Sequence, residues 1–220
     1  MSTIDTRSLI RVGILALPLG GLLKLAGNLA TFNSIGPGIP QPEEAATVTS
    51  PAFLIGGLVG NIGPTLLTPF WLIPLGFYLA STLNAYRRMV LTGVVLVLLG
   101  SGIALAALGV VNYAVPALGH AYQAGDAGAM DIADSFFRWP RGAMLYPAVL
   151  APIGTILLAI VMWRSGALPR ILAVLFALSA VLISLPAALH IPHVAGGVLG
   201  VVAGVWMAVI LRRTVDQPSS

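Results

Sequence analysis

The stretch Gly57–Gly76 reads GLVGNIGPTLLTPFWLIPLG and contains no charged residue. It lies within a longer apolar run, Ala52–Ala80, and an α-helix needs about 20 mostly apolar residues to cross a bilayer. The stretch therefore predicts a membrane-spanning helix. Its three prolines follow one another at five-residue spacing, and each removes a backbone donor. We expect this helix to be kinked or locally unwound near Gly60–Pro64.

The rest of the chain has the same apolar character. It is 58% hydrophobic and only 8% charged, whereas a soluble domain has about one quarter charged residues. With a mean hydropathy of +0.97, such a chain cannot cover a surface that faces water. We predict an all-α integral membrane protein, a single transmembrane domain over residues 1–220 built as a six-helix bundle. The expected spans are Leu9–Ala30, Ala52–Ala80, Met89–Val111, Ala143–Trp163, Leu168–Leu189 and His193–Leu211.

The basic residues orient this bundle. With the N-terminus inside, the inner segments hold eight arginines and the outer segments hold two, so the positive-inside rule predicts that both termini are cytoplasmic, N-in/C-in. The long loops 31–51 and 112–142 are then outside. A cleaved signal peptide is the alternative for the first span, but Lys24 stands between its apolar core and the cleavage site. The inner arginines are Arg7, Arg11, Arg87, Arg88, Arg164, Arg170, Arg212 and Arg213, and the outer ones are Arg138 and Arg141.

Charge and composition exclude several classes of function. The net charge of +4 does not indicate nucleic acid, because the basic residues lie at helix ends and form no block with interleaved aromatic residues. Cysteine is absent, which excludes disulfides and thiolate chemistry. No GxSxG, Walker A or HExxH motif occurs, so no cofactor is predicted and enzymatic activity stays open. The Arg- and Ala-rich composition is typical of a GC-rich bacterial genome, and we expect a multi-pass protein of the cell inner membrane.

Lys24 is the one charged residue deep within a predicted span, and such residues are costly in lipid and functional candidates by default. With Asn28 and Thr31 it forms a polar stripe at helical spacing, and a second stripe follows in the next span. Both stripes lie roughly 6–8 Å outside the midplane. Because consecutive helices usually touch, we expect the stripes to meet. The predicted ligand-binding residues are Lys24, Asn28, Asn61, Thr65 and Thr68.

No acidic residue lies in any predicted span, so the partner of Lys24 stays open. Its amine can snorkel to the outer interface or donate to carbonyls freed by Pro64. Glu43 or Glu44 can fold down from the outer loop. The functional alternative is an anionic ligand, either a lipid phosphate or a fatty carboxylate.

These features favour a lipid- or amphiphile-binding or accessory bundle with an outward-facing pocket near Lys24. The first alternative is a membrane-embedded enzyme that acts on a lipid or isoprenoid through Lys24 or through His120, His190 and His193. The second is a small transporter. The absence of an internal sequence repeat disfavours a repeat transporter.

The stretch HIPHVAGGVLGVVAG, His190–Gly204, carries two histidines and three glycines at four-residue spacing. Pro192 is expected to break the helix, so that His190 and His193 cap a tight outer turn. No metal site is predicted, and ligation by these residues with His120 is the less favoured alternative. Small residues at this spacing let helices approach closely in lipid. We expect Gly56, Gly60, Gly196, Gly200 and Gly204 to pack helices within the bundle, with a homodimer through the last three as the alternative.

The second outer loop contains DAGAMDIADSFFRW, residues 126–139. This segment predicts a short helix with Asp126 as its N-cap. Met130, Ala133 and Phe137 share one face at helical spacing. We interpret the segment as an interfacial anchor, with a lid over the pocket as the alternative.

The segment WRSGALPRILAVLFALSAVL, Trp163–Leu182, resembles a family of bacterial six-helix membrane proteins described as domain of unknown function 4386. That family has a similar aromatic–Arg–Ser–Gly–x–Leu–Pro–Arg inner loop that leads directly into an apolar helix. The resemblance implies a six-helix fold and a membrane location. It implies no activity and no catalytic residues.

Overall fold

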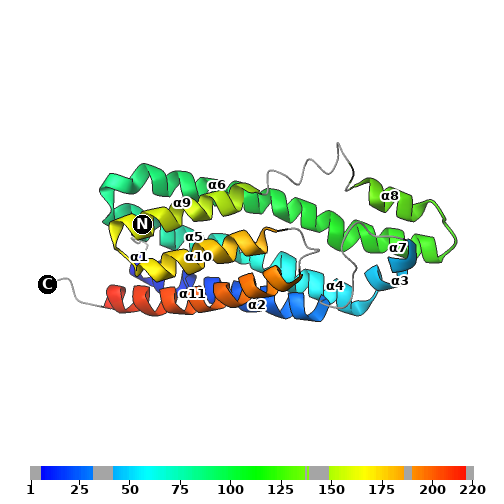
Figure 1. The fold of residues 1–220 in the computed structure, drawn as a ribbon, viewed down its shortest axis with the longest axis horizontal. Coiled ribbons are helices and arrows are strands. Elements are labelled where there is room, and N and C mark those ends of the chain that lie inside the picture. The colour runs from blue at the N-terminus through cyan, green and yellow to red at the C-terminus, as the bar shows by residue number, and fades with distance from the viewer. Residues whose placement is uncertain (1–5, 32–41, 137, 139–148, 186–189, 217–220) are drawn as a thin grey trace, which may run out of the picture.

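A computed structural model describes residues 6–31, 42–136, 138, 149–185 and 190–216, and it contains helices but no strands within them. Figure 1 shows an elongated bundle, with α1 and the end of α11 at one end and α3, α7 and α8 at the other. The α-helices are α1 (Thr6–Gly13), α2 (Ala16–Thr31), α3 (Ala45–Val48), α4 (Pro51–Gly57), α5 (Gly63–Thr82), α6 (Arg87–Gly109), α7 (Val115–Gln123), α8 (Ala129–Ser135), α9 (Leu150–Ser165), α10 (Arg170–Ile183) and α11 (His190–Asp216). Two 3-10 turns, η1 (Pro42–Glu44) and η3 (Asn84–Tyr86), and two π-helical turns, η2 (Leu58–Ile62) and η4 (Val110–Ala114), join them.

The all-α prediction and the membrane character are confirmed in their coarse form. Within the described residues, four helices are long and apolar enough to cross a bilayer, and α9 and α10 are shorter apolar helices. The six predicted spans thus correspond to four helices of sufficient length and two shorter ones. The four long helices are Ser8–Leu29, Pro51–Thr82, Asn84–Gln123 and Ile191–Thr214.

The irregularity expected near Gly60–Pro64 is present as the π-helical turn η2. Pro64 has no N–H to donate to the carbonyl four residues earlier, so the ladder shifts by one residue before it. The Gly63 amide accordingly bonds to the Leu58 carbonyl, five residues back. The helix stays continuous through this turn and carries Pro69 and Pro74 inside α5.

The helix of the third predicted span does not end at Val111. The π-helical turn η4 lies there instead, and the helix continues as α7 to Gln123. At a rise of about 1.5 Å per residue, a 40-residue helix is about twice as long as the ~30 Å hydrocarbon core is thick. The predicted outer loop 112–142 therefore begins as a helical extension.

This extension carries a small cluster outside the main core. It consists of Val48, Phe53 and Val115, which are buried against one another. Helix α8 buries Met130 and Ala133, two of the three residues predicted to share one face. Phe137 lies outside the described residues. Asp126 is not the N-cap of α8, because the helix begins two residues later than expected, at Ala129. The Asp126 carboxylate instead accepts from the Gly128 amide at 3.1 Å.

The prediction that Pro192 breaks the helix is wrong. Helix α11 begins at His190 and contains Pro192 in its first turn, where backbone amides have no partner within the helix and the missing N–H costs nothing. His193 nevertheless ties the first turn of α11 to the end of α10, since its Nε2 lies 2.8 Å from the Leu185 carbonyl oxygen. The side chain of His190 lies outside the described residues.

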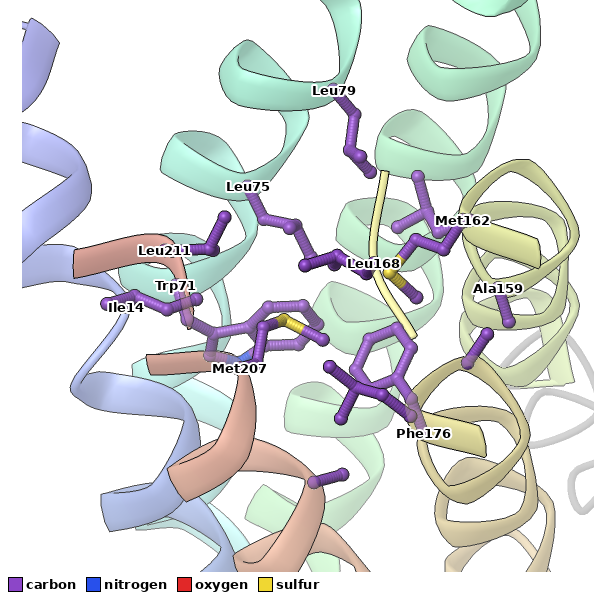
Figure 2. Packing of buried hydrophobic residues seen from close by; sticks show 14 of the residues in the cluster. Ile14, Trp71, Leu75, Leu79, Ala159, Met162, Leu168, Phe176, Met207 and Leu211 are labelled. Atoms are coloured by element: carbon purple, nitrogen blue, oxygen red, sulfur yellow. The ribbon is translucent and has the colours of Figure 1, made fainter. Parts of the chain in front are cut away.

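The main core lies toward the end that holds α1 and the end of α11. Figure 2 shows Trp71 edge-on to Phe176, with ring centroids 5.7 Å apart, among Leu75, Met162 and Met207. Because these residues come from four different helices, the cluster packs α5, α9, α10 and α11 together.

The predicted packing glycines lie at helix contacts within the chain. A methyl group on Gly196 or Gly200 would meet α10, and one on Gly204 would meet the backbone of Pro18 in α2. A methyl group on Gly27 would overlap the backbone of Gly60 and crowd the carbonyl of Gly56. These contacts support the interpretation that the glycines pack helices within the bundle.

Candidate functional site

The two polar stripes meet as the sequence predicted. Lys24 on α2 points its amine at Asn61 in η2, and Nζ donates to Oδ1 over 2.7 Å. The close contact of Gly27 with Gly60 brings the two backbones together one turn away, so the residues reach each other. The site therefore depends on two glycines as well as on its polar side chains.

The π-helical turn sets the position of Asn61. Its backbone carbonyl accepts from Thr65 Oγ1 at 2.7 Å, and Thr68 Oγ1 bonds in the same way to the Pro64 carbonyl at 3.3 Å. These hydroxyls satisfy carbonyls around the proline, where the regular ladder is interrupted. The side-chain oxygen of Asn61 is thereby available to accept the hydrogen bond from Lys24.

A cavity of about 510 Å³ lies beside this pair. Its volume is in the range of small-molecule sites, and its wall is mostly apolar. Lys24 is the only charged side chain among the described residues that line it. Trp71 and Phe176, the aromatic pair of the core, also line the cavity. The polar lining residues are Lys24, Asn61, Thr65, Thr68, Ser101, Thr155, Ser179 and Ser184.

Among the described residues, no carboxylate forms an ion pair with Lys24 or lines the cavity. Glu43 and Glu44 lie in η1, which precedes α3, and are not part of the wall. The amine is held by Asn61 instead. Of the partners considered from the sequence, a described carboxylate is therefore not used.

Asn28 serves a different contact. Its Nδ2 donates to the His193 carbonyl at 3.3 Å, which joins α2 to the first turn of α11. It does not line the cavity, whereas Asn61, Thr65 and Thr68 do. The side chain of Thr31, the third member of that stripe, lies outside the described residues.

The histidines are spread over the molecule. His120 is exposed in α7, and His193 bonds to the turn after α10; neither lines the cavity. Among the described residues, no group of three His, Asp or Glu side chains lies close enough to hold a metal ion.

Sequence reasoning missed the part of the cavity wall that α6, α9 and α10 contribute. Ser101 comes from α6, Thr155 from α9, and Ser179 and Ser184 from α10 and its end. Each is a single hydroxyl in an apolar helix, which ordinarily bonds to its own backbone and carries no signal in the sequence. Only the fold brings these residues into one cavity with Lys24.

Comparisons with family models, with curated proteins and with solved structures give no match for this chain. The resemblance of Trp163–Leu182 to a six-helix membrane family stays a prediction.

Proposed function

We propose that the protein is a six-span inner-membrane protein that binds an anionic amphiphile in the cavity beside Lys24. The observation that carries the proposal is the Lys24–Asn61 pair at the wall of a largely apolar cavity to which no described carboxylate contributes. A cation in lipid without an acidic partner favours a ligand that brings its own negative charge.

Surface exposure supports a lipid environment. Leu66, Phe70, Ile73 and Phe77 follow helical spacing along α5, and all four are exposed large apolar side chains. Such a stripe is unfavourable in water and ordinary in a bilayer. We count α9 and α10 as crossings too, because α9 packs lengthwise against α6 and α10 against α11.

The proposed orientation has the end with α1 and the end of α11 in the cytoplasm. The connections between α5 and α6 and between α9 and α10 lie at the same end (Figure 1). Arginines gather at these positions, as the positive-inside rule expects for a cytoplasmic face. The cavity then lies in the outer half of the membrane. The arginines at the cytoplasmic end are Arg87, Arg88, Arg164, Arg170, Arg212 and Arg213.

The shape of the site favours an amphiphile over a small ion. The amine and amide are at one side of the cavity, and the remaining wall includes Leu17, Trp71, Leu108 and Phe176. A small inorganic anion would leave this apolar surface without a partner. An amphiphile can occupy the whole cavity, because its head group binds Lys24 and its hydrocarbon portion contacts the apolar wall.

Native mass spectrometry of the gently purified protein tests the proposal. Wild type is expected to retain an anionic lipid or acid, and Lys24→Met is expected to lose it while staying folded. Arg88→Met, which removes an exposed charge far from the cavity, is the matched control and should retain the ligand. If wild type and Lys24→Met carry the same unspecific lipid background, the proposal is wrong.

A further inference from the structure

The hydroxyl groups of the cavity wall have a common feature. Among the described residues, five of the six hydroxyl side chains that line the cavity bond to a backbone carbonyl. The bonds run from Thr65 to Asn61 at 2.7 Å, Thr68 to Pro64 at 3.3 Å, Thr155 to Ala151 at 2.9 Å, Ser179 to Gly196 at 2.8 Å and Ser184 to Ala180 at 2.6 Å.

These bonds determine what the wall offers to a ligand. A carbonyl oxygen can only accept, so each of these hydroxyls uses its single proton on the backbone. What remains on each oxygen is lone-pair density. The wall built by α5, α9 and α10 therefore presents hydrogen-bond acceptors, and Ser101 on α6, for which no such bond is recorded among the described residues, is the exception.

The side of the cavity formed by α2 and η2 has the opposite character. Lys24 spends one of its three N–H donors on Asn61. Because the Asn61 oxygen accepts that bond, its NH₂ group faces away from the amine and keeps two donors. This side offers donors and a positive charge, whereas the other offers acceptors.

We propose that the ligand is a lipid whose head group combines one anionic phosphodiester with neutral hydroxyl groups. This inference rests on the proposed function and adds the second half of the head group. The anion binds Lys24 and Asn61, and the hydroxyls donate to the acceptor wall. An ammonium group would supply donors too, but it would place a second cation near Lys24 with no described carboxylate to pair it.

Three lipids with the same acyl chains test the inference on the full-length protein. Phosphatidylglycerol has the anion and two hydroxyls, phosphatidylmethanol has the anion alone, and phosphatidylcholine has neither hydroxyls nor net charge. Equal mixtures are added in detergent, and the retained fractions are measured by native mass spectrometry. We expect phosphatidylglycerol to exceed phosphatidylmethanol about three- to ten-fold, the effect of one or two net hydrogen bonds.

Matched variants test which residues cause the preference for phosphatidylglycerol over phosphatidylmethanol. Thr155→Val removes an acceptor that α9 contributes to the wall, and Thr155 has no bond to Lys24 or Asn61, so the ratio of phosphatidylglycerol to phosphatidylmethanol should fall with little change in the retention of phosphatidylmethanol. Thr82→Val is the control, because Thr82 makes the same bond to its own helix, to the Tyr78 carbonyl at 2.7 Å, but is exposed away from the cavity. Lys24→Met should reduce the retention of both anionic lipids.

The possible results separate the two proposals. Equal retention of both anionic lipids above phosphatidylcholine overturns the hydroxyl inference and leaves the anion pocket standing. A preference for phosphatidylglycerol that Thr155→Val and Thr82→Val affect equally also overturns it, because the acceptor wall is then not its source. Equal retention of all three lipids, unchanged by Lys24→Met, overturns the proposed function itself.

Discussion

The π-helical turns η2 and η4 are built alike and used differently. Each spans five residues, contains one asparagine and precedes a proline, Pro64 or Pro116. Each ends with an amide that bonds five residues back. Asn61 in η2 faces Lys24 beside the cavity. Asn112 in η4 is 4% exposed and lies against Gly57.

The difference shows that the neighbouring helix decides the role of such a turn. Both turns displace an asparagine from the regular helical register. Opposite Asn61 stand a lysine and a cavity, so its amide is available to a charged partner. Opposite Asn112 stands a glycine, so the side chain is enclosed: Nδ2 donates to the Leu108 carbonyl at 2.7 Å, and Oδ1 has no hydrogen-bond partner among the described residues. One turn forms a site and the other a packing contact.

Gly57→Ala is expected to have the largest effect on stability. The added methyl group would overlap Asn112 Oδ1, and the enclosed side chain has little room to move. Overpacking of this kind costs about 1–3 kcal/mol of unfolding free energy. Unfolding of the purified protein in mixed detergent micelles with increasing sodium dodecyl sulfate measures it.

Gly102→Ala is the control for this variant. Gly102 lies within α6 and has no atom within 4 Å of an added methyl group, so this substitution should be neutral or slightly stabilising. The double variant Gly57→Ala, Asn112→Ala should recover most of the loss. Equal stability of Gly57→Ala and Gly102→Ala would show that the η4 asparagine is not packed as described.

The second contrast concerns binding. Asn61→Ala removes the acceptor that holds the Lys24 amine and an amide donor of the cavity, so retention of an anionic lipid should fall about three- to ten-fold. Asn112→Ala should change retention by less than about two-fold, because Asn112 is not part of the cavity wall. Native mass spectrometry with phosphatidylglycerol measures both. A similar loss in both variants would mean that the two turns act as one unit.

The sequence predicted one half of the site and not the other. Lys24 and Asn61 were placed together by counting depth along two consecutive spans, and Pro64 marked the turn correctly. Thr155 and Ser179 could not be found, because an isolated hydroxyl in an apolar helix follows no period and the partners of α9 and α10 depend on tertiary packing. The missing half is therefore a property of helix arrangement.

Helix ends were predicted less well than helix cores. The sequence predicts that the third helix ends at Val111, yet the π-helical turn η4 precedes Pro116 and the helix continues to Gln123. The sequence predicts that Pro192 breaks the helix, but a proline in the first turn of a helix has no intrahelical hydrogen bond to lose. In both places a proline was compatible with the helix, since its missing donor fell at a turn or at a helix start.

The smallest expected effect on lipid affinity comes from replacing the proline that follows each π-helical turn. Pro64→Ala restores an amide that can bond to the Gly60 carbonyl, so a regular α-helical turn becomes a competing conformation. If that form takes half to four fifths of the molecules, the apparent affinity for the lipid falls about two- to five-fold. Pro116→Ala should relax η4 in the same way without changing affinity, because η4 lies outside the cavity wall.

Spin labels can report the change of conformation separately from binding. The chain has no cysteine, so Leu22→Cys and Leu66→Cys place labels on exposed positions of α2 and α5 alone. Pro64→Ala should broaden or shift the distance between them by pulsed electron resonance, because α5 rotates relative to α2 when η2 becomes α-helical, and Pro116→Ala should not. If Pro116→Ala moved these labels or lowered affinity as much as Pro64→Ala, the Gly57–Asn112 contact would couple the two turns, and η4 would belong to the site.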